Sequence, residues 1–149
     1  MGTMQAWADA WLREVETAAR ALDRERQAAS ARREAVLKLG SPLATGPHGK
    51  GGIADPMAAV DAMLDAEQSA DALAWARETM DEFYRAMGAV RAGCEGEIAE
   101  GTVAAELRYA LGMSAAQAAR ELGWSRSTYY NRLAALVDYL DYIGPSIRK

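Results

Sequence analysis

The sequence predicts an all-α protein, and three observations support this prediction. The chain is rich in alanine and contains a single phenylalanine and few β-branched residues, a composition that favours helix over strand. Two long segments, 4–39 and 56–92, have apolar residues at helical spacing. A shorter region, 102–149, carries helix start and stop signals at close intervals. With half of its 149 residues apolar, the chain can build its own core.

Residues 4–39 contain no proline or glycine and are predicted to form one helix of about nine to ten turns. Its apolar seam is thin, so this helix must pack against another helix. Trp7 and Trp11 are interpreted as anchors of that helix–helix contact, and an exposed interaction patch is the alternative. The seam consists of Met4, Trp11, Val15, Ala18, Leu22, Ala29 and Val36.

Residues 40–55 hold five glycines and two prolines and are predicted to be a flexible connector. Gly49-Lys50 superficially resembles part of a phosphate-binding loop. The required spacing fails because Ala44 stands where the first glycine belongs and Gly51 follows the lysine. Nucleotide binding is therefore excluded, and His48 is interpreted as a solvated side chain.

Asp55-Pro56 is a strong helix start, and the second helix is expected to run over 56–92. Its apolar residues follow a strict alternation of three and four, which is typical of a coiled-coil-like seam. This helix is acidic and the first is slightly basic, so an antiparallel hairpin over residues 1–93 is predicted. The seam residues are Leu73, Ala76, Met80, Phe83, Met87, Val90 and Cys94.

Residues 93–101, with three glycines and three glutamates, are predicted to be a hinge between this hairpin and a second unit at 102–149. The first helix of that unit is expected over 103–111, packing Val103, Leu107 and Leu111 inward. Gly144-Pro145 should end the last helix, and the final three residues are expected to fray.

Within residues 107–140, Ser114 and Gln117 form a capping-box pattern, and Gly123 suits a helix end. Ser125 is a second N-cap and starts a long helix. A helix, a three-residue turn and a second helix are the layout of a helix-turn-helix, whose second helix lies in the DNA major groove. A purely structural helical hairpin is the alternative.

The segment LRYALGMSAAQAARELGWSRSTYYNRLAAL resembles the region-four helix-turn-helix of bacterial sigma factors. It resembles still more closely the ArpU and RinA type of phage late-gene activator. The resemblance covers about a quarter of the chain and implies a phage or prophage regulator. It departs from the family at Ala118 and Tyr129, where isoleucine and valine are common, and this exchange can conserve core volume. The matching positions are Leu107 with Tyr109, Gly112 with Ser114, and Leu122 and Gly123 with Ser125.

On the second helix of this motif, spacing directs Tyr129, Leu133 and Leu136 to the core. Four candidate DNA-contacting residues then point outward, namely Arg126, Ser127, Tyr130 and Asn131. Arginine suits guanine and asparagine suits adenine, whereas serine and tyrosine suit phosphate. Arg132 and Arg120 are interpreted as further phosphate contacts.

The net charge of −4 does not argue against DNA binding, because residues 51–101 carry 11 acidic and 3 basic side chains. The segments on either side are each slightly basic, and a DNA reader needs only local positive potential. No catalytic constellation or metal-ligand spacing is present, so neither an enzyme nor a cofactor is expected. No signal peptide or membrane-spanning run is recognised, so we expect a cytoplasmic protein.

The sequence thus predicts a sequence-specific transcriptional regulator that binds double-stranded DNA as a homodimer formed through its N-terminal helices. The hairpin could instead contact RNA polymerase. Two other classes stay open: a phage small terminase subunit, which packages DNA, and a helical interaction module that binds no DNA.

Overall fold

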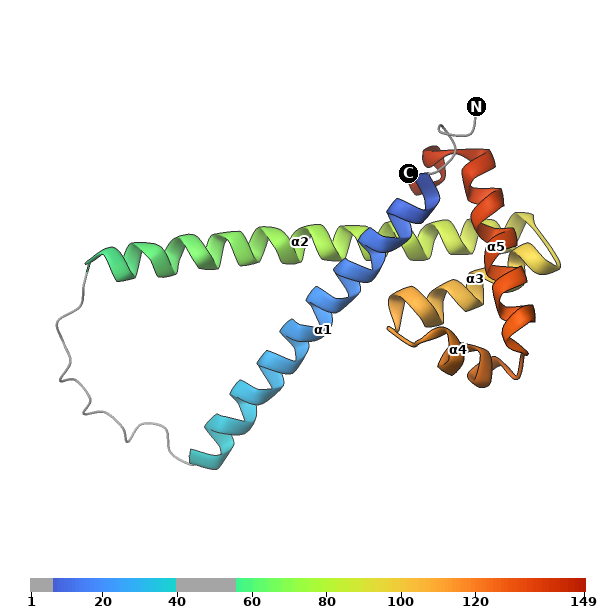
Figure 1. The fold of residues 1–149 in the computed structure, drawn as a ribbon. Coiled ribbons are helices and arrows are strands. Elements are labelled where there is room, and N and C mark those ends of the chain that lie inside the picture. Colours follow the sequence, from blue (N-terminus) through green and yellow to red (C-terminus); the bar gives the residue numbers. More distant parts are fainter. Residues whose placement is uncertain (1–6, 40–55) are drawn as a thin grey trace.

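The computed structural model describes residues 7–39 and 56–149, and all regular structure in these ranges is helical (Figure 1). The prediction of an all-α fold is confirmed. The predicted connector 40–55, with His48, and the predicted helix start at 4–6 lie outside the described residues. The elements are α1 (Trp7–Leu39), α2 (Pro56–Gly93), α3 (Glu97–Ala105), a π-helical turn (Glu106–Ala110), α4 (Ala115–Leu122), α5 (Arg126–Ile143) and a 3₁₀ turn (Pro145–Arg148).

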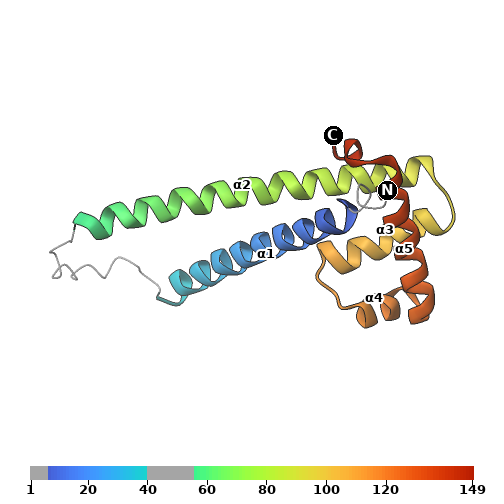
Figure 2. The ribbon, with the colours of Figure 1, turned by 45° about the horizontal axis from the view of Figure 1, so that its top comes forward.

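The helices α1 and α2 run antiparallel and pack where the first half of α1 meets the second half of α2 (Figures 1 and 2). Away from this contact the two helices diverge. Beyond Ala18 no described residue of α1 is buried, and none is buried in α2 before Ala76. The predicted seam residues therefore lie on the correct side of each helix, but the two helices bury them over only part of the seam. Its buried members are Trp11, Val15 and Ala18 of α1 and Ala76, Met80, Phe83, Met87 and Val90 of α2.

The core at this junction is completed by α5, whose Leu136 and Leu140 pack in the same cluster as Trp11 and Phe83. The start of α1 is fixed to the end of α5, because Trp7 Nε1 donates a hydrogen bond to the Leu140 carbonyl oxygen over 2.9 Å. Trp7 and Trp11 thus anchor helix contacts within one chain. They no longer support the predicted dimer contact through the N-terminal helices.

The predicted hinge over 93–101 is wrong in its second half. Only Cys94–Gly96 separates α2 from α3, and Gly101 is buried within α3. A Cβ atom on Gly101 would lie 2.8 Å from Leu136 Cβ and still closer to the Arg132 carbonyl oxygen. This glycine therefore serves the close approach of α3 to α5 and does not loosen the chain.

The helix expected over 103–111 instead begins at Glu97 and ends in the π-helical turn. In that turn the Leu111 amide donates to the Glu106 carbonyl oxygen over 3.0 Å, five residues back. The wider turn shifts the side chains that follow it out of the α-helical phase. Leu107 still packs inward, but Leu111 is 62% exposed, and its predicted burial was wrong.

The end of the chain is ordered, although fraying was expected. Gly144 terminates α5 as predicted, and the following 3₁₀ turn lies against α2. Ile147 packs on the main core, and the Arg148 guanidinium lies 3.3 Å from Glu82 Oε1. An apolar and an ionic contact together hold this short segment in place.

Candidate nucleic-acid interface

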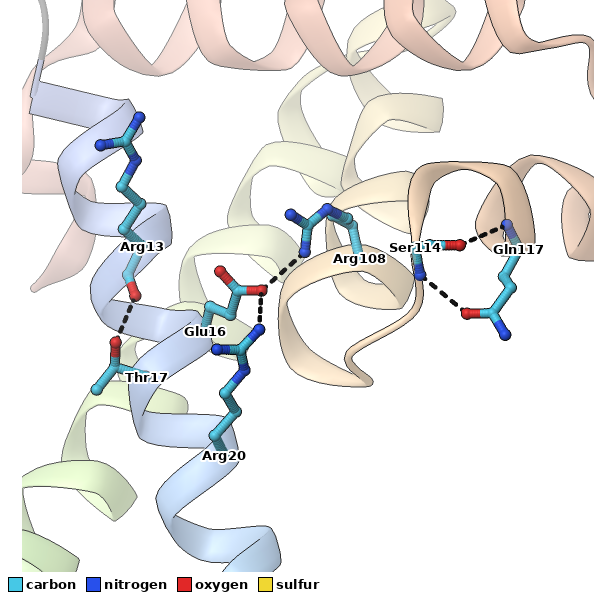
Figure 3. A network of polar contacts seen from close by, with 7 residues as sticks. All are labelled: Arg13, Glu16, Thr17, Arg20, Arg108, Ser114 and Gln117. Atoms are coloured by element: carbon cyan, nitrogen blue, oxygen red, sulfur yellow. Dashed lines mark hydrogen bonds and ion pairs between the residues drawn. The ribbon is translucent and has the colours of Figure 1, made fainter.

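The unit formed by α4, a three-residue turn and α5 has the boundaries that the sequence predicts. The Gln117 amide donates to Ser114 Oγ over 3.1 Å, and the Ser114 amide donates to Gln117 Oε1 over 3.0 Å, which completes the capping box (Figure 3). Gly123 ends α4 at a φ of 72°, a conformation that glycine adopts without steric cost. Ser125 Oγ accepts a hydrogen bond from the Thr128 amide over 3.1 Å and starts α5.

The inner side of this unit is built on Tyr129, which is fully buried, as predicted, against the alanines of α3 and α4. Small side chains at Ala104, Ala118 and Ala119 make room for the ring. The Tyr129 hydroxyl has no hydrogen-bond partner among the described residues. Burial raises the pKa of this phenol to about 12. The phenol is therefore neutral at physiological pH. Its ring fills the space between α5 and the alanines of α3 and α4.

The outer side presents the first two turns of α5. Arg126, Ser127, Tyr130 and Asn131 are all exposed, and Tyr130 remains 54% accessible beside its buried neighbour. Arg120 on α4 is exposed as well. The predicted outward orientation of the four residues on α5 is confirmed, whereas the contact of all five residues with DNA stays a prediction.

Arg132 behaves differently from the other candidate residues. Its guanidinium carbon lies 4.4 Å from the centroid of the Trp124 ring, and its Nε is 3.2 Å from Glu100 Oε1 on α3. The side chain is committed to contacts within the molecule, so its placement does not support the predicted phosphate contact. Spacing along α5 could not reveal this, because Glu100 belongs to a helix that only the fold brings alongside.

A cleft of about 580 Å³ opens between α1, the start of α4 and the start of α5. Arg20, Arg108 and Tyr130 all contribute to its lining. Glu16 Oε2 accepts from Arg20 Nη2 over 3.1 Å and from Arg108 Nη1 over 2.8 Å (Figure 3). One carboxylate between two guanidinium groups leaves this corner positively charged. Arg20 was not predicted, because nothing near it in the sequence indicates that α1 reaches the α4–α5 unit.

Within the described ranges, no group of three or more His, Cys, Asp or Glu side chains could hold a metal ion. The same part of the chain contains no helix with an apolar run long enough to cross a bilayer. Comparisons with protein-family models, with curated proteins and with solved structures give no match for this chain.

Proposed function

We propose that this protein is a sequence-specific transcriptional regulator that binds double-stranded DNA through a helix-turn-helix formed by α4 and α5. One observation carries the proposal: the first two turns of α5 present a cluster of exposed polar side chains on a helix whose other side is locked in a core. A recognition helix needs this combination, because its base-reading groups must be free while its axis is fixed. The cluster consists of Arg126, Ser127, Tyr130 and Asn131.

In this proposal α5 enters the major groove with its N-terminal end leading. Arg126 can donate two hydrogen bonds to guanine, and Asn131 can pair with the edge of adenine, each contact contributing about 1–3 kcal/mol of discrimination. Tyr130 and Arg120 suit phosphate oxygens on either side of the groove. Arg20 of α1 adds a cation beside Tyr130 and extends the phosphate-contacting surface.

Few cations surround the cluster, so we propose modest affinity for each single subunit and tighter binding by paired subunits or with a partner such as RNA polymerase. Each phosphate that a protein neutralises contributes through counterion release, and few such contacts give a shallow salt dependence. We also propose a phage or prophage origin and action on DNA in the bacterial cytoplasm, and the resemblance to phage activators alone supports this part of the proposal.

The test is binding of the full chain to duplexes selected from a random pool, measured by fluorescence anisotropy at several salt concentrations. A footprint on the DNA flanking its own gene then locates an operator. Arg126→Ala should weaken binding to the selected duplex by about tenfold to a hundredfold and flatten the preference at one base pair. Arg85→Ala is the matched control, because Arg85 is exposed on α2, outside the cluster.

Two outcomes would overturn the proposal. If the wild-type chain selects no duplex and binds none even at low salt, the α4–α5 unit is a scaffold and the protein is an interaction module. If the chain binds DNA but assembles as a ring of eight or more subunits, DNA packaging by a small terminase subunit is the better reading.

A further inference from the structure

The two long helices separate away from the core, and their free ends carry exposed apolar side chains. We call residues 24–38 of α1 and 60–75 of α2 the distal arms. Val36 is 53% exposed on one arm, and Leu64 is 50% exposed on the other. Single exposed apolar residues are ordinary, but a row of them along a helix marks a contact surface.

On α2 the exposed row follows one face of the helix, with steps of four, three, four and four residues. We call this row, Val60, Leu64, Glu67, Asp71 and Trp75, the α2 stripe. At about 100° per residue, the stripe lies about 150° around the helix from the seam that packs on α1. Closing the two arms together within one chain would therefore leave the α2 stripe uncovered. On the seam side, this arm holds Asp65, Ser69 and Ala72, which are small or acidic and exposed, followed by Leu73, which is partly buried.

On α1 the distal arm carries a complementary surface. A cleft of about 460 Å³ is lined by apolar side chains and two arginines, and we call it the α1 groove: Ala29, Arg32, Arg33, Val36 and Leu37. Among the described residues, these arginines form one ion pair, between Arg32 and Glu25 over 3.3 Å, and the two side chains are 66% and 42% exposed. An exposed ion pair of this kind contributes little to stability, so Arg32 can exchange Glu25 for another acidic partner at little cost in free energy.

The charges of the two arms are opposite. Residues 24–38 of α1 hold five basic and two acidic side chains, whereas residues 60–75 of α2 hold four acidic and no basic ones. An apolar stripe with two carboxylates matches an apolar groove with two guanidinium groups. Because both surfaces belong to the same chain, two copies related by a twofold axis would form the contact between stripe and groove twice.

We propose that two copies of this chain associate through their distal arms, with the α2 stripe of each copy seated in the α1 groove of the other. This interface differs from the predicted contact through Trp7 and Trp11, which the core of a single chain uses. It leaves the outer side of α5 free in both copies. The inference does not depend on DNA binding, and its test is made without DNA.

The first experiment is sedimentation analysis of the full chain across a concentration series from about one to a hundred micromolar. The wild type should be a dimer at the upper end. Leu64→Glu should weaken dimerisation at least about tenfold, because a carboxylate would enter the apolar contact. Tyr142→Glu is the matched control, since the Tyr142 ring is 83% exposed near the end of α5 and lies away from both arms, and it should leave the dimer intact.

The second experiment reverses the charges on each surface. The variant Glu67→Arg/Asp71→Arg and the variant Arg32→Glu/Arg33→Glu should each be monomeric, because both contacts of either homodimer would join like charges. When the two variants are mixed, one contact regains opposite charges and the other is wild-type, so a heterodimer should form. Closure of the arms within one chain cannot produce this complementation.

A wild-type chain that stays monomeric throughout the series overturns the inference. So does a dimer that Leu64→Glu weakens no more than Tyr142→Glu. A mixture of the two charge variants that remains monomeric overturns the pairing of the α2 stripe with the α1 groove. Circular dichroism of each variant should match the wild type, because all the substituted side chains are exposed or partly exposed on preformed helices.

Discussion

The inner and outer sides of the α4–α5 unit are made from adjacent residues and follow different physical rules. The inner side is one aromatic ring packed against alanines and other apolar side chains. The outer side is polar and exposed. Tyr129 and Tyr130 show the contrast directly, because their ring centroids are 5.2 Å apart and only the first is buried.

Substitutions on the inner side should therefore change stability, and substitutions on the outer side should change binding. A change on the inner side alters the distance between helices and is measured in the free energy of unfolding. A change on the outer side alters the groups available to a ligand, and its effect is measured as a change in the affinity for that ligand.

The largest effect is expected from Tyr129→Ala. Removing a fully buried ring leaves a cavity that the surrounding alanines cannot fill, and such deletions lower the free energy of unfolding by roughly 3–5 kcal/mol. Tyr130→Ala, one residue along, should change it by less than about 0.5 kcal/mol, as surface substitutions do. Urea denaturation measures both. Equal losses for the two variants would mean that α5 is rotated relative to the structure described here.

Gly101→Ala should destabilise the protein by about 1–3 kcal/mol, because the added methyl group meets the backbone of α5 at Arg132 and the side chain of Leu136. The control is Gly88→Ala. Gly88 lies exposed inside α2 with open space around it, so alanine should raise the stability there by about 0.5–1 kcal/mol. Thermal unfolding of the two variants should therefore shift in opposite directions. A stabilised Gly101→Ala would refute the close approach of α3 to α5.

On the outer side, Arg120→Ala should weaken DNA binding almost equally for all sequences, if this arginine contacts phosphate as proposed. Losing one phosphate contact reduces the salt slope of the binding constant by about 1. Asn131→Ala should instead change the preference among sequences and leave the salt slope unchanged. Anisotropy titrations with selected and unrelated duplexes distinguish the two effects. Interchanged results would mean that the base-reading and phosphate-contacting roles are wrongly assigned.

A pH-dependent effect is expected above pH 10. The pKa of Tyr129 rises from 10.0 to about 12 on folding, so between these values the folded chain keeps a proton that the unfolded chain releases. The stabilising contribution is complete below pH 10 and is lost as the pH rises through about 12. Tyr129→Phe cannot ionise, so its free energy of unfolding should fall less steeply over this range.

At neutral pH the same variant should be at least as stable as the wild type, because the Tyr129 hydroxyl has no partner to lose among the described residues. Urea denaturation at three pH values compares the two proteins. Parallel pH dependences would show that this phenol titrates normally and is more accessible than its burial implies.

Local sequence signals determined the helices, their caps and the phase of their buried faces. The capping box at Ser114 and the left-handed Gly123 each depend on interactions within a few residues, and the inward direction of Tyr129 follows from helical spacing. Such short-range interactions can be read without knowing the fold. The all-α class and the outward direction of Arg126, Tyr130 and Asn131 follow from the same signals.

Only the tertiary structure decided which helices meet and how far. Gly101 looked like a hinge because local rules associate glycine with flexibility, and its use as a close-packing site depends on Leu136 of α5. Arg132 looked free until α3 placed Glu100 beside it, and Trp7 needed a partner that turned out to be the carbonyl of Leu140. Contacts between residues distant in sequence depend on how the packed helices cross, and no short stretch of sequence encodes that geometry.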